Sequence, residues 1–212
     1  MATLRQPCSI LAGPELRGPR APALQGLNGK STGGRIESEA SGESDVEAIR
    51  ELLIDQMRDL LHAEKRLVKG LPKMVKAANH QGLAGLFKTH LAETEGQVER
   101  LNEGLQMLNV PARAKACKGM MGLLEEGDEV IAENGKKGEA LADLALIGAA
   151  QKVEHYEISA YTTARNLAQQ LKMPELVQLL QLSLAEEENA DQLLNQVARP
   201  LMSAARMPAA IE

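Results

Sequence analysis

Aromatic residues are nearly absent from this 212-residue chain, which has no tryptophan and only Phe87, Tyr156 and Tyr161. The cores of β-sandwiches and β-barrels depend on aromatic and β-branched side chains, so this composition argues against both architectures. Leucine and alanine supply most of the apolar content, while Glu, Lys, Arg and Gln supply much of the polar content. These residues favour helices, and they predict an all-α protein.

Cysteine, long apolar runs and clustered basic residues are also scarce. Cys8 and Cys117 lie far apart, which predicts neither a disulfide framework nor a thiolate metal site and favours a reducing, cytoplasmic compartment. No apolar run is long enough to span a bilayer, so we expect no membrane partner. The net charge is −5 and no basic stripe interrupts the acidic background, so we expect no nucleic-acid partner.

The first 43 residues differ from the rest because they are rich in Gly, Pro and Ser and show no helical period. We expect residues 1–43 to form a disordered or flexible N-terminal extension. Their basic, acid-poor character leaves a transit segment as the alternative. Residues 44–199 are expected to form one helical domain, and residues 200–212 a flexible C-terminal tail that begins at Pro200.

The helical domain contains an internal repeat at a shift of 93 residues. Identical residues align in several motifs: Leu53-Ile54 with Leu146-Ile147, His62-x-Glu64 with His155-x-Glu157, and Leu91-Ala92-Glu93-x-Glu95 with Leu184-Ala185-Glu186-x-Glu188. Each repeating unit has the pattern of two helices. The domain is therefore predicted to consist of two related helix pairs.

Apolar residues at spacings of three and four predict four long helices, at about 44–78, 83–108, 139–171 and 174–197. Ser44 is the expected N-cap of the first helix, and Pro72 is expected to kink it. Short loops make each pair antiparallel, whereas residues 112–137, with one short amphipathic helix, can travel the length of a bundle. This pattern predicts a ferritin-like four-helix bundle of two antiparallel pairs with a long crossover.

Carboxylates recur on the core faces of both helix pairs. Glu64 and Glu157 are equivalent under the shift, and each lies between apolar residues of a core face. Further candidate ligands lie at this level or about one turn away: His90, Glu93, Glu154, Glu186, Glu187 and Asp191. Ionised carboxylates repel one another in an apolar core unless cations balance them. We therefore predict two metal ions, and the donors favour iron, or else manganese, over zinc or copper.

Each residue also has a plainer interpretation. A glutamate beside a helix face usually buries its stem and leaves its carboxylate in water. In the run Glu186-Glu187-Glu188 at least one carboxylate must face solvent, because consecutive helical residues point about 100° apart. The metal hypothesis rests on the joint pattern, in which core-facing glutamates occupy equivalent places in both repeats.

Several strings resemble one known family: His62-Ala63-Glu64-Lys65-Arg66-Leu67, residues 90–101 and Gln151-Lys152-Val153-Glu154-His155-Tyr156-Glu157-Ile158. Over about residues 45–198 the chain is similar to the YciF-like branch of the ferritin-like superfamily. This resemblance implies a rubrerythrin-like bundle, a carboxylate-bridged dimetal centre, a homodimer and a role in bacterial stress response. The expected primary ligands are Glu64, Glu93, Glu157 and Glu186, and the expected secondary ligands or supports are His90, Glu154, Glu187 and Asp191.

One departure from the superfamily pattern keeps a second function open. Ferritin-like dimetal proteins carry Glu-x-x-His on two helices, whereas Glu93 is followed by Gly96 and Glu186 by Asn189. The first hypothesis is a di-iron protein that reacts with dioxygen or peroxide, as an oxidase or peroxidase, or that handles iron. The alternative is a non-catalytic stress protein, such as a dimeric scaffold with a degenerate metal site. A larger storage cage is disfavoured because the sequence shows no fifth C-terminal helix after Pro200.

Overall fold

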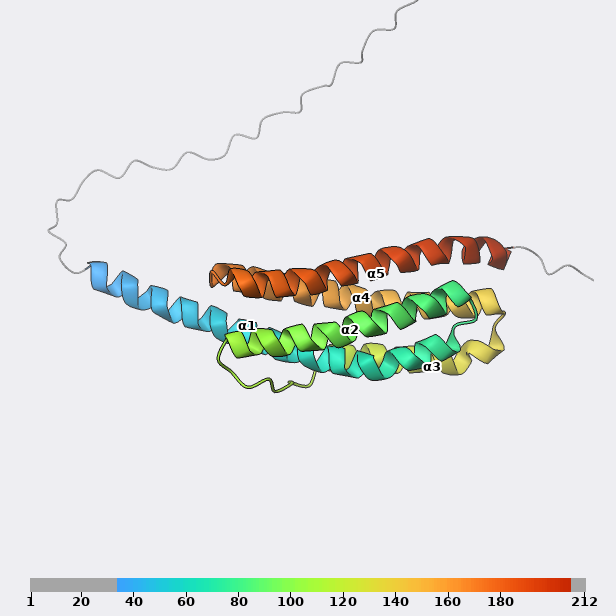
Figure 1. Ribbon diagram of the computed structural model, residues 1–212, viewed down its shortest axis with the longest axis horizontal. Coiled ribbons are helices and arrows are strands. Elements are labelled where there is room, and N and C mark those ends of the chain that lie inside the picture. Colours follow the sequence, from blue (N-terminus) through green and yellow to red (C-terminus); the bar gives the residue numbers. More distant parts are fainter. Residues whose placement is uncertain (1–33, 207–212) are drawn as a thin grey trace, which may run out of the picture.

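A computed structural model describes residues 34–206 of the chain (Figure 1). Within that range it has five α-helices, a short 3₁₀ helix and no strand: α1 (Gly34–Ala77), α2 (Gln81–Met107), α3 (Lys118–Glu133), η1 (Asn134–Lys136), α4 (Glu139–Gln170) and α5 (Pro174–Arg206). The all-α prediction is confirmed. The division into two long helix pairs, joined by a segment with one short helix, is confirmed as well.

The four long helices form a bundle in which neighbouring helices run antiparallel. α1 packs against α2 and α4, and α5 packs against the same two helices from the opposite corner (Figure 1). α3 lies outside this square, along the face formed by α1 and α4. The crossover therefore carries the chain back along the bundle, so that α4 begins beside the end of α1.

A buried aspartate holds the two helix pairs in position relative to each other along the bundle. Asp143, near the start of α4, accepts hydrogen bonds from the amides of Asn79 and His80 at 2.8 and 2.7 Å. The His80 side chain caps α2, because its Nδ1 accepts a hydrogen bond from the Leu83 amide at 3.4 Å. The loop between α1 and α2 is thereby tied to α4 by contacts that satisfy buried polar groups.

Two helix ends differ from their predicted positions. α1 begins at Gly34 rather than at Ser44, and α5 continues through Pro200 to Arg206. Residues 34–43 contain no proline, and a weak helix former costs a helix only about 1 kcal/mol. Leu201 is buried in an apolar cluster, which offsets the backbone hydrogen bond that Pro200 removes. The rest of the predicted extension (1–33) and of the tail (207–212) lies outside the described residues.

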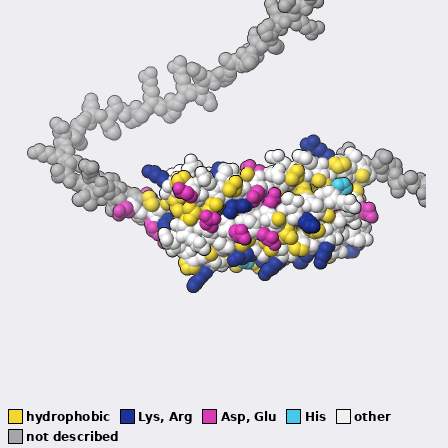
Figure 2. All heavy atoms as spheres, in the orientation of Figure 1, with side chains coloured by type: hydrophobic (Ala, Val, Ile, Leu, Met, Phe, Trp, Pro, Cys, Tyr) yellow, Lys and Arg dark blue, Asp and Glu magenta, His cyan; other side chains and the backbone are white. Residues whose placement is uncertain are grey.

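The surface carries charges of both signs. On the face shown in Figure 2, basic and acidic side chains are interspersed with small apolar patches. The charges on this face therefore do not combine into a field of one sign. None of the helices between residues 34 and 206 has both the length and the apolar composition that a bilayer crossing requires.

The core consists of two apolar clusters with a polar layer between them. One cluster contains Met57, Leu101 and Leu176, and the other contains Phe87 and Leu146. Between them the four long helices contribute buried polar side chains: Glu64, His90, Thr94, Gln97, Glu154, Glu157, Ser183 and Glu187. Burying charge costs free energy that apolar side chains in the same places would not, so this layer points to a function.

Candidate metal centre

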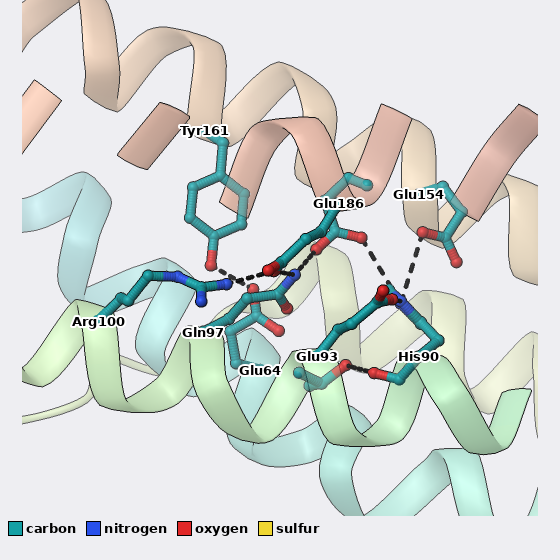
Figure 3. Close-up of polar contacts among 10 residues, drawn as sticks. Glu64, His90, Glu93, Gln97, Arg100, Glu154, Tyr161 and Glu186 are labelled. Carbon is teal, nitrogen blue, oxygen red and sulfur yellow. Dashed lines mark hydrogen bonds and ion pairs between the residues drawn. The ribbon is translucent and has the colours of Figure 1, made fainter. Parts of the chain in front are cut away.

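The polar layer draws acidic and imidazole donors from all four long helices (Figure 3). α1 contributes Glu64, α2 contributes His90, α5 contributes Glu187, and α4 contributes both Glu154 and Glu157. The two glutamates of α4 are three positions apart and therefore share one face of the helix. Each of these five residues is at most 3% exposed. His90, Glu154, Glu157 and Glu187 each offer one ligand atom within 4.8 Å of the others.

His90 lies within the group of carboxylates. Its Nε2 is 3.5 Å from Oε2 of both Glu154 and Glu187, and its Nδ1 is 3.3 Å from Oε2 of Glu93. Desolvation opposes a charged ring, but the hydrogen bond to Glu93 and the charge of Glu187 outweigh it and raise the pKa of His90. When Nδ1 donates its proton to Glu93, Nε2 presents a lone pair to the group.

Two neutral side chains donate hydrogen bonds to these carboxylates. The hydroxyl of Tyr161 donates to Oε1 of Glu64 at 2.6 Å (Figure 3). Nε2 of Gln97 donates to Oε1 of Glu187 and, at 3.0 Å, to Oε2 of Glu186. Each donor satisfies one oxygen of its buried carboxylate, so the second oxygen of Glu64 and of Glu187 stays free for another partner.

The layer holds most of the unpaired buried polar atoms between residues 34 and 206. Among the described residues, nine buried side-chain nitrogen or oxygen atoms lack a hydrogen-bond partner. Seven of the nine belong to the layer: Oε2 of Glu64, Nε2 of His90, Oε1 of Gln97, Oε2 of Glu154, both oxygens of Glu157 and Oε2 of Glu187. Buried polar groups are nearly always paired in folded proteins, so such a concentration calls for a partner that bonds to several atoms together.

Burial changes the acidity of all four carboxyls. Desolvation, with repulsion from Glu187, raises the pKa of Glu64 to about 8. Desolvation likewise raises the pKa of Glu154 to about 8 and holds the pKa of Glu157 and of Glu187 well above the ordinary value. Without cations, the layer therefore keeps protons that the same groups release in water. Cations bound in the layer would displace those protons and take the oxygens as ligands.

The remaining three predicted ligands lie outside this buried group. The side chains of Glu93 and Glu186 are each 28% exposed, and that of Asp191 is 17% exposed. Glu186 pairs with Arg100, and Asp191 accepts a hydrogen bond from Gln151 at 2.8 Å. These partners already satisfy the carboxylates, so Glu186 and Asp191 have less need of a cation.

The acidic run on α5 is therefore shifted by one position from the expected arrangement. Glu187, not Glu186, has the buried carboxylate. The buried face of α5 runs through Leu184, Glu187 and Leu194, at helical spacings of three and seven, and Glu186 points about 100° away from it. On α2 the buried face presents His90, so that helix contributes an imidazole where a carboxylate was expected.

Three buried side chains of the layer were not among the predicted site residues. Thr94, Gln97 and Tyr161 are all fully buried. The 93-residue shift contained a signal for two of them, because it aligns Thr94 with Glu187 and Gln97 with buried Ala190. The tyrosine had no such signal, because an aromatic side chain on a core face usually serves only as packing.

A bundle of four antiparallel helices with buried carboxylates and an imidazole between two apolar clusters defines a helical protein with a polar centre. The chain belongs to the family described as Domain of unknown function (DUF892), whose family model matches residues 48–206. It is 40% identical over 154 residues to Protein YciF of Escherichia coli (strain K12), which covers 72% of this chain and 92% of that protein. The predicted membership of the YciF-like branch is confirmed.

Solved structures show the same fold. The structure of the E. coli stress protein YciF matches with a TM-score of 0.70 and 37% identity, over 73% of this chain and 97% of that chain. YcfI of Rhodopseudomonas palustris, described as a candidate structural protein, matches with a TM-score of 0.67 and 35% identity, over 71% and 94%. A protein of Xanthomonas campestris shares the fold, with a TM-score of 0.57 at 21% identity, over 74% and 94%.

Proposed function

We propose that the chain is a dimetal protein of the ferritin-like kind that binds two cations, iron or manganese. The observation that carries this proposal is the group of buried ligand atoms: five carboxylate oxygens and Nε2 of His90 make no hydrogen bond to any described residue, although Nε2 lies 3.5 Å from two of these carboxylates. A buried acceptor that lacks a donor costs about 1–3 kcal/mol. Cations that bind these atoms would satisfy several of them at once.

The charge of the donor set favours two ions over one. Glu64, Glu154, Glu157 and Glu187 carry four negative charges when ionised, which two divalent cations balance without any proton. A single divalent cation would leave two negative charges, or two protonated carboxyls, inside the bundle. Uncompensated charge in a protein interior is strongly destabilising. Mixed carboxylate and imidazole donors suit iron and manganese.

Three side chains around the layer would hold the ligands in place. Glu93 fixes the ring of His90, while Tyr161 and Gln97 each bind one oxygen of a neighbouring glutamate. Such contacts orient metal ligands and raise metal affinity. Iron held there would supply electron exchange with dioxygen or peroxide, or would be retained as bound iron. E. coli YciF is described as a stress protein, so we propose that this activity serves a stress response.

Metal analysis after anaerobic loading with Fe²⁺ tests the proposal. We expect about two equivalents per chain, because the donors suffice for two ions. Glu187→Gln should reduce loading sharply, whereas Glu188→Gln should leave it unchanged, because Glu188 is the exposed neighbour on the same helix. Wild-type protein that retains less than about a tenth of an equivalent of iron or manganese would contradict the proposal.

A non-catalytic scaffold is the second candidate, and Thr94 favours it. This residue stands where the repeat would place a carboxylate, and its hydroxyl is already occupied by a hydrogen bond to the carbonyl of His90 at 2.8 Å. Protonated carboxyls could then serve a purely structural layer. In that case Glu157→Gln raises the melting temperature of the purified protein, because it removes an acid from the core. In a metal-bound protein the same change lowers it, because bound metal stabilises the native state.

We further propose that the chain forms a homodimer, as its resemblance to the YciF-like branch implies. α1 extends past the other helices at its N-terminal end (Figure 1), and Val46 and Leu52 in the N-terminal half of this helix are about half exposed. Apolar side chains on a projecting helix are available to a second chain. Sedimentation equilibrium should give twice the chain mass of 22.8 kDa. A single species at the chain mass would contradict the dimer.

A further inference from the structure

A small apolar cavity adjoins the polar layer on the side that α3 covers. It has a volume of about 40 Å³ and lies between α1, α3 and α4. Its walls include Leu67 and Leu71 of α1, Leu124 and Ile131 of α3, and Val153 of α4. Apart from two acidic residues, every residue that lines it is apolar or glycine. Such walls offer no hydrogen bonds to an occupant.

The two acidic residues of the lining lie at different depths. Asp128 is 55% exposed and pairs with Lys73 at 2.8 Å, so it marks the outer side of the cavity. The side chain of Glu154 is only 4% exposed, and its unpaired Oε2 is 3.5 Å from Nε2 of His90. The cavity therefore extends between the surface beside Asp128 and a carboxylate of the candidate metal centre.

The size and the lining of this cavity select the kind of molecule that fits. One water molecule needs a cavity of about 10–15 Å³, so the space is sufficient for a molecule of two heavy atoms. Water also needs two to four polar partners, which these walls do not supply. An ion would lose its hydration at high cost. A small, uncharged, apolar molecule such as dioxygen meets none of these penalties.

The opposite side of the layer has a different character. A groove of about 420 Å³ between α2 and α5 reaches His90 and Glu93, and its lining is mixed: half of the residues are apolar or glycine, and the polar half includes His80, Asn189 and Gln196. Unlike the apolar cavity, this groove offers several polar partners to hydrated ions and hydrogen peroxide. Polar molecules therefore do not need the apolar cavity as a path to the layer. The lining of that cavity suits an apolar molecule instead.

We propose that the cavity beneath α3 binds dioxygen and presents it to the Glu154 side of the polar layer. The purpose of this site rests on the proposed dimetal function, but the binding step needs no metal. We therefore expect dioxygen to bind in this cavity in the metal-free protein as well, and this binding can be measured without any activity.

Nuclear magnetic resonance of the metal-free full chain under oxygen pressure tests the binding step. Dissolved dioxygen is paramagnetic and accelerates the relaxation of protons close to it. The methyl groups of Leu124, Ile131 and Val153 should relax several-fold faster than those of Leu141 and Leu182, which are exposed to bulk solvent. Acceleration at the cavity that does not exceed that at the exposed methyls would overturn the proposal.

Two glycines of α3 provide a matched pair of variants. A Cβ on Gly127 meets no atom within 4 Å, and Gly127 lines the cavity. Gly122 is equally open, lies on the same helix and is not part of the lining. Gly127→Leu should abolish the accelerated relaxation and Gly122→Leu should retain it, although both raise helix propensity equally. Leu124→Ala enlarges the cavity and should increase the effect at Val153. Retention of the full effect in Gly127→Leu would contradict the assignment.

A kinetic comparison of oxidants tests delivery. When dioxygen oxidises iron in the loaded protein, it takes two electrons from two Fe²⁺ ions and two protons from solvent, and leaves as hydrogen peroxide. Gly127→Leu should slow this oxidation about tenfold, equivalent to about 1.4 kcal/mol, and leave oxidation by added hydrogen peroxide unchanged. If Gly127→Leu oxidises iron with dioxygen as fast as wild type does, delivery through the cavity is overturned. If the chain retains no metal, the dimetal function fails while the relaxation result still decides the binding site.

Discussion

The two helix pairs share one repeated sequence pattern but contribute different chemistry. Glu64 of the α1–α2 pair and Glu157 of the α4–α5 pair occupy equivalent positions, and both are fully buried. Elsewhere the equivalence breaks. Glu154 aligns with Leu61, and His90 aligns with Ser183, although all four of these residues are buried. The α4–α5 pair thus supplies three of the four acids of the polar layer, while the α1–α2 pair supplies one acid and the imidazole.

This difference shows that a repeated helix pair can keep the position of its polar layer while the side chains that fill the layer change. The helical period and the shared register keep the same positions at the core, whichever residue occupies them. Thr94 and Glu187 illustrate the point, because both are fully buried at aligned positions and only one is a carboxylate. A duplicated sequence therefore predicts where the polar layer lies better than it predicts which donors fill it.

The pH dependence of stability should show the largest consequence of this asymmetry. In metal-free protein the carboxyls of Glu64 and Glu154 have a pKa of about 8 instead of the ordinary 4.5. The folded state then holds protons that the unfolded state releases, so stability is greatest near pH 4.5 and falls as the pH rises towards 8. Each such group contributes a slope of up to about 1.4 kcal/mol per pH unit. Urea unfolding after chelation, repeated across this pH range, measures the loss.

Substitution of the buried glutamates by glutamine measures how much of this slope each helix pair contributes. Replacing Glu154, Glu157 and Glu187 together by Gln should remove most of the slope, whereas Glu64→Gln alone should remove the smaller part. Glu188→Gln is the control, because Glu188 is exposed. A stability that stays flat or rises between pH 5 and 8 would show that the buried acids do not hold their protons.

Restoring the missing acid should break the asymmetry. Thr94→Glu gives α2 the residue that α5 carries at the aligned position. In metal-free protein, an added carboxyl that is buried without a hydrogen-bond partner should cost about 1–3 kcal/mol. In metal-loaded protein the new oxygen is an additional ligand, so the melting temperature should rise on loading by more than in wild type. Thr89→Glu is the control, because Thr89 is exposed on the same helix. Thr94→Glu that destabilises both forms equally would contradict a ligand role for this position.

A smaller effect is expected where the pairs differ in their supporting side chains. Tyr161 donates to Glu64, whereas its aligned residue in the first pair is Val68. Tyr161→Phe removes only the hydroxyl and should cost metal-free protein about 1–2 kcal/mol, because a buried acceptor loses its donor. A double-mutant cycle with Glu64→Leu measures whether the loss belongs to this pair. Additive effects of the two substitutions would place the contribution of Tyr161 elsewhere.

Much of the fold was predictable because it depends on repeated, local signals. Apolar spacing located all four long helices, and the long segment after Pro111 indicated the crossover. Helix ends were less predictable. Ser44 has the chemistry of a cap but lies inside α1, and Pro200 has the chemistry of a break but lies inside α5. Both depend on interactions beyond the local sequence.

The position of the site along the bundle was predictable, whereas the side chains that form it were less so. The repeat placed Glu64 and Glu157 correctly in the core, because two aligned helices share a face. Within the run Glu186-Glu187-Glu188, a helical rotation of about 100° per residue decides which acid is buried. Apolar spacing defines the direction of the buried face only to within about one such rotation, so it could not choose between neighbouring acids. The contact of Arg100 with Glu186 joins α2 to α5 across the bundle, and no local pattern predicts such a contact.

Arg100 offers the smallest test of the comparison, because its aligned residue in the second pair is Leu193. The guanidinium also donates to Oγ of Ser183 at 3.0 Å, so it links two polar side chains of α5 to α2. The pair with Glu186 is 20% and 28% exposed at its two ends, and ion pairs that reach solvent contribute only about 0.2–1 kcal/mol. Arg100→Leu should therefore lower stability by less than about 1 kcal/mol in urea unfolding, and high salt should reduce the difference. Metal loading should stay at the wild-type level, because Glu186 lies outside the buried group. A loss of metal in this variant would show instead that the pair positions the neighbouring Glu187, and that the two helix pairs are coupled through their partly exposed residues as well as through the buried layer.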